Sequence, residues 1–136
     1  MILIFGGIGE PCIEVAEKFS DRSFKTLDVS SLEPDSRMTD EADNLILNGW
    51  EAWAEMRLHE EEASVFQEAS RWNALPSHET YLIMEDCSCG LVPLSGRERE
   101  LREARGRLLQ FFSGEASEVF RVIAAIPIQL KGEQHV

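Results

Sequence analysis

The sequence is poor in basic residues and has no long apolar run. It contains 13 Lys and Arg against 25 Asp and Glu, which gives a formal net charge of −12. Nucleic acids and anionic membrane surfaces bind basic surfaces, so neither is an expected partner of this chain. No apolar run approaches the roughly 20 residues that a membrane-spanning helix needs, so the sequence predicts no membrane span.

Cysteine is also scarce, with three residues in the chain. An odd number of cysteines in a chain of this size fits a reducing compartment better than a disulfide framework. The apolar run at the N-terminus has no basic residue before it and stops at two glycines. We therefore interpret it as a buried strand rather than a signal peptide, and we expect a cytoplasmic protein.

The composition is that of an ordinary globular protein, with 43% hydrophobic and 28% charged residues. A chain of 136 residues is long enough for one hydrophobic core and too short for two. No internal repeat, low-complexity tract or linker divides it. We expect a single domain over residues 1–136.

Short apolar runs alternate with helical patterns along the chain. Strands are expected at 1–5, 24–29, 80–84 and 118–126, with Pro127 interrupting the last one. Helices are expected to begin near residue 14 and to cover about 39–53, 55–72 and 97–112. This alternation predicts an α/β domain with a mainly parallel sheet.

A glycine-rich loop follows the first strand and precedes a helical pattern. The loop reads Gly6-Gly7-Ile8-Gly9-Glu10-Pro11-Cys12-Ile13. Strand, glycine loop and helix form the context in which G-x-x-x-x-G-K-[ST] binds nucleotide phosphates. Counted from Gly6, the lysine position holds Cys12 and the hydroxyl position holds Ile13. The loop thus lacks the lysine that neutralises phosphate charge and the hydroxyl that holds Mg²⁺.

Glu10 adds a negative charge to a loop that would have to bind an anion. Phosphoryl transfer depends on positioning and electrostatic stabilisation, so we expect no standard kinase activity. Weak nucleotide binding through backbone N–H groups is one alternative, and a pocket without nucleotide function is another, which we favour. The glycines can also serve only to form a tight turn that lets strand and helix pack closely.

The C-terminal third carries an ungapped series of residues typical of one family. They are Gly90-Leu91-Val92-Pro93, Arg99, Leu101-Arg102-Glu103, Gly106-Arg107-Leu108, Gln110, Ala116, Glu118-Val119 and Ala124-Ala125-Ile126-Pro127-Ile128-Gln129-Leu130-Lys131. The series resembles the bifunctional adenosylcobinamide kinase/adenosylcobinamide-phosphate guanylyltransferase family of cobalamin biosynthesis. Its members carry G-[IL]-V-P, a helix ending in G-R-x-N-Q and a strand closing in A-G-[LI]-P-[LI]-x-L-K. Gly6 and Gly7 match the start of the family loop G-G-x-x-S-G-K-S.

The resemblance implies a three-layer fold with a mostly parallel sheet of the P-loop NTPase/RecA-like type, here shortened in the middle. It also implies a homo-oligomer, a trimer in the family. A corrinoid or a nucleotide is the implied ligand, with GTP or ATP and Mg²⁺ as cofactors if the loop still binds. Asp86 falls at the family's acidic strand end, so it joins Gly6, Gly7, Gly9, Glu10, Cys12 and Ile13 as a candidate nucleotide-binding residue.

The chain also departs from the family pattern. Members of the family have a histidine that accepts GMP, and only His59 is a candidate for this role here. Its spacing from Met56 differs from the family pattern, so the alternative is that His59 is an exposed histidine beside a run of glutamates. We therefore expect a divergent member of this family that is linked to corrinoid metabolism. Because the loop lacks the lysine and the hydroxyl residue, we expect it to be a pseudoenzyme. The alternatives are a non-catalytic oligomeric protein that binds a corrinoid, a small molecule or a partner enzyme, and an enzyme that retains only nucleotidyl transfer.

Two further groups of residues have alternative interpretations. Cys12, Cys87 and Cys89 lie on loops that should open at the same sheet edge, where three thiols would suit a soft metal or a cobalt centre. The Cys-x-Cys spacing and the lack of a fourth ligand favour idle thiols. The tryptophans Trp50, Trp53 and Trp72 are expected in the core, or alternatively on an exposed aromatic face for a second protomer or a flat macrocycle.

Overall fold

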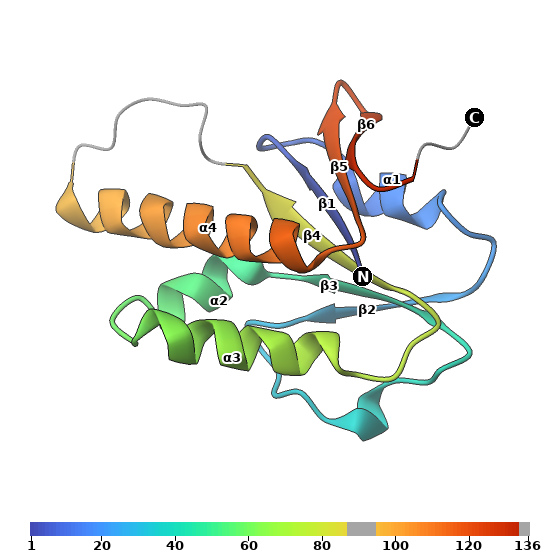
Figure 1. Ribbon diagram of the computed structural model, residues 1–136, viewed down its shortest axis with the longest axis horizontal. Helices are drawn as coiled ribbons and strands as arrows, with labels where there is room; N and C mark the ends of the chain where they lie inside the picture. Colours follow the sequence, from blue (N-terminus) through green and yellow to red (C-terminus); the bar gives the residue numbers. More distant parts are fainter. Residues whose placement is uncertain (87–94, 134–136) are drawn as a thin grey trace.

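The computed structural model describes residues 1–86 and 95–133. Within these residues the chain forms an α/β fold, in which one mixed, mostly parallel sheet is flanked by helices (Figure 1). The strands are β1 (Ile2–Gly6), β2 (Phe24–Asp28), β3 (Asn44–Asn48), β4 (Thr80–Glu85), β5 (Glu118–Ile123) and β6 (Ile126–Lys131). The helices are α1 (Cys12–Glu17), the 3-10 helix η1 (Ser36–Met38), α2 (Trp50–Met56), α3 (Glu62–Asn73) and α4 (Gly96–Glu115).

The six strands lie in the order β2-β3-β4-β1-β5-β6. The first five are parallel, and β6 returns antiparallel to β5. β1 is therefore a central strand, with β4 on one side and β5 on the other. The connection from β1 through α1 runs to β2, whereas the connection from β4 through α4 runs past β1 to β5.

The core consists of two apolar clusters, one on each face of the sheet. Because successive strand residues point to opposite faces, Leu3 and Phe5 of β1 pack with α2, α3 and α4, whereas Ile2 and Ile4 pack with α1. The helices that follow β1 and β4, α1 and α4, thus lie on opposite faces of the sheet. In open α/β sheets such a reversal leaves a crevice at the carboxyl ends of the strands, where ligands bind.

The tryptophans belong to the core. Trp50, Trp53 and Trp72 are 0%, 1% and 1% exposed. The Trp50 ring meets the rings of Trp53 and Phe112 edge-on, at 5.2 and 4.7 Å between centroids, and its indole N–H donates to the carbonyl of Leu47 at 3.2 Å. The core interpretation is therefore confirmed, and the exposed aromatic face for a macrocycle or a protomer is wrong.

The helix expected over 39–53 is wrong in its first part. Residues 44–48 form β3, a strand between β2 and β4 whose first four residues are buried. Gly49 then turns the chain into α2 with a φ of +84°, and a Cβ at this position would collide with Asp28. The helix expected over 55–72 is also two elements, because α2 ends at Met56 and α3 begins at Glu62.

The C-terminal elements agree better with the sequence. The helix expected over 97–112 is confirmed as α4, whose first turn is capped by the Ser95 hydroxyl accepting from the Glu98 N–H at 3.1 Å. The last strand, however, ends at Ile123. Ala124 and Ala125 turn the chain with φ of 51° and 64°, and β6 returns along β5. Pro127 lies within β6 rather than ending the strand, because an edge strand accommodates proline.

No helix in residues 1–86 and 95–133 combines the length and the apolar character that crossing a bilayer requires.

Candidate functional site

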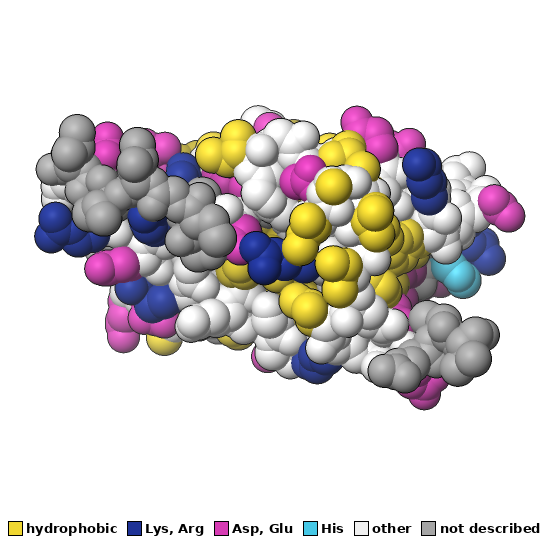
Figure 2. Space-filling model, turned by 90° about the horizontal axis from the view of Figure 1, so that it is seen from above, with side chains coloured by type: hydrophobic (Ala, Val, Ile, Leu, Met, Phe, Trp, Pro, Cys, Tyr) yellow, Lys and Arg dark blue, Asp and Glu magenta, His cyan; other side chains and the backbone are white. Residues whose placement is uncertain are grey.

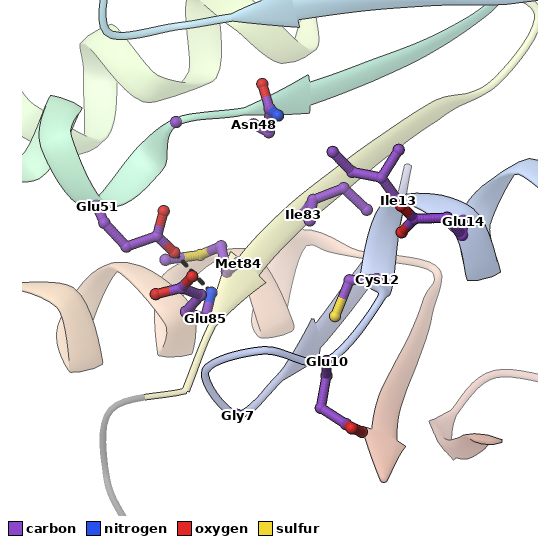
Figure 3. A pocket seen from close by; sticks show the side chains of 11 residues that line it. Gly7, Glu10, Cys12, Ile13, Glu14, Asn48, Glu51, Ile83, Met84 and Glu85 are labelled. Carbon is purple, nitrogen blue, oxygen red and sulfur yellow. Dashed lines mark hydrogen bonds between the residues drawn. The ribbon is translucent and has the colours of Figure 1, made fainter. Parts of the chain in front are cut away.

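A cleft of about 270 Å³ lies at the carboxyl ends of β1, β3 and β4, at the crevice predicted by the topology (Figure 3). Three segments line it, namely the glycine loop with the start of α1, the β3–α2 junction, and the end of β4. The lining residues are Gly7, Glu10, Cys12, Ile13, Glu14, Asn48, Gly49, Glu51, Ile83, Met84 and Glu85.

Four of the candidate nucleotide-binding residues line this cleft, namely Gly7, Glu10, Cys12 and Ile13. Gly6 does not line it and is closely packed, since a Cβ there would lie 3.0 Å from the carbonyl oxygen of Val122. At this position the glycine serves close packing between strand and loop.

The two other candidates lie beside the cleft rather than in its wall. Gly9 adopts a left-handed conformation, with a φ of +90°, in the loop. Asp86 follows β4, and its backbone N–H donates to the carbonyl of Gly6 at 2.8 Å. The Asp86 carboxylate is 3.9 Å from the guanidinium of Arg121. This acidic residue therefore joins the end of β4 to β1 and β5.

Two backbone donors of the loop are used within the loop itself. The N–H of Glu10 donates to Gly7 at 3.1 Å, and the N–H of Cys12 donates to Glu10 at 2.9 Å. Pro11, the residue before α1, has no N–H, and no side chain in the described part of the chain caps the helix. A phosphate loop points its N–H groups at the phosphate oxygens, and these two N–H groups are not free to do so.

The side chain of Glu10 points away from the middle of the cleft and toward the β5–β6 turn (Figure 3). Its Oε2 accepts a hydrogen bond from the N–H of Ala125 at 3.3 Å. Glu10 thus fastens the glycine loop to the tip of the neighbouring hairpin.

On the opposite wall, Glu51 of α2 bridges to the end of β4. Its Oε1 accepts from the N–H of Glu85 at 2.6 Å, and the two side chains lie next to each other in Figure 3. Burial raises the pKa of Glu51 above its usual value, and the nearby Glu85 adds to this effect, while the hydrogen bond to the Glu85 N–H and the charge of Arg105 oppose it. Glu51 therefore holds its proton more readily than an exposed glutamate does.

The thiol of Cys12 is buried among these carboxylates. Burial first, and then the charges of Glu10, Glu85, Glu14 and Glu51, raise the pKa of Cys12 to about 11. Only a thiolate is a good nucleophile or metal ligand, so Cys12 is inert at neutral pH.

The predicted three-thiol metal site has two of its members, Cys87 and Cys89, outside the described residues. Among the residues that are described, no three His, Cys, Asp or Glu side chains are grouped so that they would hold a metal ion. The three-thiol site stays a prediction, with only Cys12 placed.

Charge of one sign dominates the cleft. Glu10, Glu14, Glu51 and Glu85 contribute carboxyl groups, and none of the described lining residues is Lys, Arg or His. Low-dielectric walls strengthen the field of such a group of charges, so the cleft repels anions and attracts cations.

His59, the candidate for the guanylylation role, lies elsewhere. It is exposed on the loop between α2 and α3 and is not part of the cleft lining. The structure does not bring it together with the glycine loop.

Sequence reasoning missed half of the cleft. Asn48, Gly49 and Glu51 were hidden because residues 44–48 were interpreted as part of a helix. The usable signal was the run Leu45-Ile46-Leu47 followed by Asn48-Gly49, since a short apolar run that ends in turn residues is typical of a buried parallel strand.

Comparison with known proteins adds no family to this geometry: no family model matches the chain, and no curated protein matches it significantly.

Proposed function

We propose that this chain is a divergent protein of the adenosylcobinamide kinase/guanylyltransferase type that binds a ligand in the cleft and does not transfer phosphate. The observation that carries the proposal is the lining of the cleft. A glycine loop in the position of a phosphate loop lines a cleft that contains four glutamates and no Lys, Arg or His among the described residues, and two of its backbone N–H groups donate within the loop.

The architecture supports the fold part of the proposal. β1 is central in a mostly parallel sheet, with helices on both faces, and it leads directly into the glycine loop and α1. This arrangement agrees with a three-layer domain of the P-loop NTPase/RecA-like type. The short segment between β2 and β4, which holds β3, α2 and α3, agrees with a version shortened in the middle.

Electrostatics supports the loss of kinase chemistry. Phosphoryl transfer needs fixed positive charge or donors at the phosphates, and one such donor contributes about 3 kcal/mol to the transition state. A carboxylate about 6 Å from a phosphate charge costs about 3 kcal/mol at an effective dielectric constant of 20. The lysine and hydroxyl positions hold Cys12 and Ile13 and the cleft is lined by carboxylates, so both contributions act against a nucleotide.

The size and charge of the cleft indicate the ligand class. A cleft of about 270 Å³ is slightly smaller than the pockets that hold drug-sized molecules. It fits a small neutral or cationic group, or one side arm of a larger molecule such as a corrinoid. Since the tryptophans are buried, stacking of a macrocycle on them is not part of the proposal.

The role of the protein is then that of a non-catalytic binding protein, a homo-oligomer by its resemblance, for a corrinoid, a related small molecule or a partner enzyme. Retained nucleotidyl transfer through His59 has no supporting contact, because that residue is exposed and outside the cleft lining.

Calorimetric titration with cobinamide, Mg·GTP and Mg·ATP tests the proposal. We expect cobinamide to bind and both nucleotides to give no heat at millimolar concentration. Glu14→Lys and Glu17→Lys form a matched pair, because both residues are exposed on α1 and only Glu14 lines the cleft. Glu14→Lys should change the affinity for cobinamide by about tenfold or more relative to Glu17→Lys, as expected for one reversed charge at the site.

Two results would contradict this function. Phosphorylation of cobinamide by a pure preparation, or binding of Mg·GTP below millimolar concentration, would show a working phosphate site. Equal affinities for cobinamide in the two lysine variants would show that the ligand binds outside the cleft.

A further inference from the structure

The hairpin of β5 and β6 exposes four large aliphatic side chains at one end of the sheet. Ile123, Ile126, Ile128 and Leu130 are 47%, 62%, 44% and 58% exposed, and we call them the β6 patch. Figure 2 shows hydrophobic side chains gathered on the face of the molecule that looks onto the top of Figure 1, where this hairpin lies. Single exposed aliphatic residues are ordinary, whereas a contiguous group marks an interaction surface.

Most of the patch lies on one face of the hairpin. Ile123 is directly paired with Ile126, and Arg121 with Ile128, so the side chains of each pair share a face. Alternation along β6 places Ile126 and Ile128 on the same side. Ile123, Ile126 and Ile128 therefore form one apolar group on this face at the edge of the sheet, with Arg121 beside Ile128.

The outer edge of β6 is available for pairing. Across residues 1–86 and 95–133, no further strand pairs with β6, which ends the sheet. Pro127 has no N–H to give to β5, so its nitrogen faces outward, and alternation makes Gln129 the next residue whose backbone faces outward. Gln129 keeps its N–H and can therefore pair with another strand.

The other edge of the sheet is protected against such pairing. β2 carries the exposed residues Lys25 and Asp28, and the Lys25 ammonium donates to the carbonyl of Met38. Charged side chains and covering segments are the usual ways in which proteins keep an edge strand from pairing. Between its turn and Lys131, β6 has no charged side chain, and its devices are Pro127 and the register shift against β5 that leaves Leu130 unpaired.

Charge indicates which occupant fits. The net charge of −12 makes two copies of the chain repel each other over most of the surface. Residues 122–130, Val-Ile-Ala-Ala-Ile-Pro-Ile-Gln-Leu, contain no charged residue. The hairpin is thus an exposed place where two copies can approach without opposing like charges.

We propose that two copies of this chain associate through the outer edges of β6, antiparallel about a two-fold axis at Gln129. Antiparallel pairing of a strand with itself is isologous, so each contact occurs twice and the assembly closes at two copies. The two Gln129 residues exchange backbone hydrogen bonds, and the β6 patches of the two copies meet on one face of the joined sheet. The result is a continuous sheet through both subunits.

Light scattering coupled to size exclusion, run from micromolar to several hundred micromolar protein, tests this association. The expected mass at the upper end is twice the 15.4 kDa of the chain. A monomer throughout the range would overturn the proposal. A trimer, which the family resemblance implies, would overturn it too, because three copies cannot share one two-fold axis.

Two matched pairs of variants locate the contact. Ile128→Arg should weaken the dimer by about 100-fold or more, because it buries an unpaired charge, whereas Thr26→Arg on the exposed edge of β2 should leave the dimer intact. Gln129→Pro removes the outward N–H, and Gln129→Ala removes the same side chain but keeps that N–H. Dimerisation should be weakened in the proline variant and retained in the alanine variant.

Circular dichroism and thermal unfolding establish that each variant is folded before its mass is interpreted. A folded Ile128→Arg variant that dimerises as tightly as wild type would overturn the proposal. So would equal dimerisation of folded Gln129→Pro and Gln129→Ala variants, since the backbone N–H would then have no role in the contact.

Discussion

The turn between β5 and β6 leads to the first prediction, that Ala125→Gly stabilises the protein. Ala124 and Ala125 both have positive φ, 51° and 64°, in a two-residue turn between antiparallel strands. Such turns match the twist of a hairpin and favour Asn-Gly or Gly-Gly, because residues with a Cβ are strained at positive φ. The family that the chain resembles has glycine at this position.

The size of the effect follows from two opposing contributions. A left-handed conformation costs an L-residue about 1–2 kcal/mol, which glycine avoids. Glycine loses more chain entropy on folding, which costs about 0.5–1 kcal/mol. The N–H of residue 125 still donates to Glu10, since the backbone is unchanged. The net stabilisation expected is about 0.5–1 kcal/mol.

Thermal unfolding measures this difference directly. For 136 residues, the usual unfolding entropy per residue converts 1 kcal/mol into about 3–4 °C, so Ala125→Gly should raise Tm by about 2–4 °C. Ala52→Gly is the matched control, because Ala52 is exposed within α2 and the same substitution there should lower Tm by about 3 °C.

The sign of the change in Tm tests whether Ala125 has a left-handed conformation. If Ala125→Gly lowers Tm as Ala52→Gly does, residue 125 does not occupy the left-handed region and the hairpin turn has another geometry.

Three further predictions concern buried polar groups. Burial raises the pKa of Glu51 in the folded state above its value in the unfolded state. Between these two pKa values the folded state binds more protons, so stability falls as pH rises through that range. Glu51→Gln should therefore raise Tm at pH 8 more than at pH 4, and an equal or opposite effect would contradict the shift. The pKa of about 11 for Cys12 predicts that iodoacetamide modifies this thiol about 100-fold more slowly at pH 8 in the folded protein than in guanidinium. Peptide mass spectrometry measures both rates, and equal rates would refute the raised pKa. Neither the oxygen nor the nitrogen of the Asn44 side-chain amide, which is buried, has a hydrogen-bond partner among the described residues. Asn44→Leu should therefore stabilise the protein by about 1–3 kcal/mol, measured by urea unfolding. A loss of stability would show that the side-chain amide is hydrogen-bonded.

Much of the fold could be predicted from the sequence where one pattern dominates a segment. β1 and β4 are uninterrupted apolar runs with turn residues after them, and α4 has a cap and twenty residues of helical pattern. These elements, with the glycine loop, predict a mainly parallel α/β sheet, which the structure confirms.

The middle of the chain could not be predicted in the same way. Ile46 of β3 lies three residues before Gly49 and four before Trp50, and Trp53 follows Trp50 by three, so a strand followed at once by a helix imitates one longer helix. Burial of β3 between two other strands removes the alternation that would have revealed it.

The candidate site was predictable on one wall only for the same reason. The glycine loop is visible in the sequence because its residues are contiguous. The opposite wall depends on Glu51 and Glu85, which are 34 residues apart and meet only because β3 and β4 are neighbours. The antiparallel return of β6 was also missed, because a turn built from two alanines has no glycine or asparagine to mark it.

The central position of β1 has a consequence for how the molecule folds. β1 is the first strand to be made, yet it pairs with β5, whose residues lie more than a hundred positions later in the chain: Ile2 pairs with Glu118. Such long sequence separations raise contact order and slow folding. During synthesis the nascent chain must hold an apolar strand without one neighbour until the C-terminal third emerges, so this protein should depend on chaperones more than a helical bundle of its size.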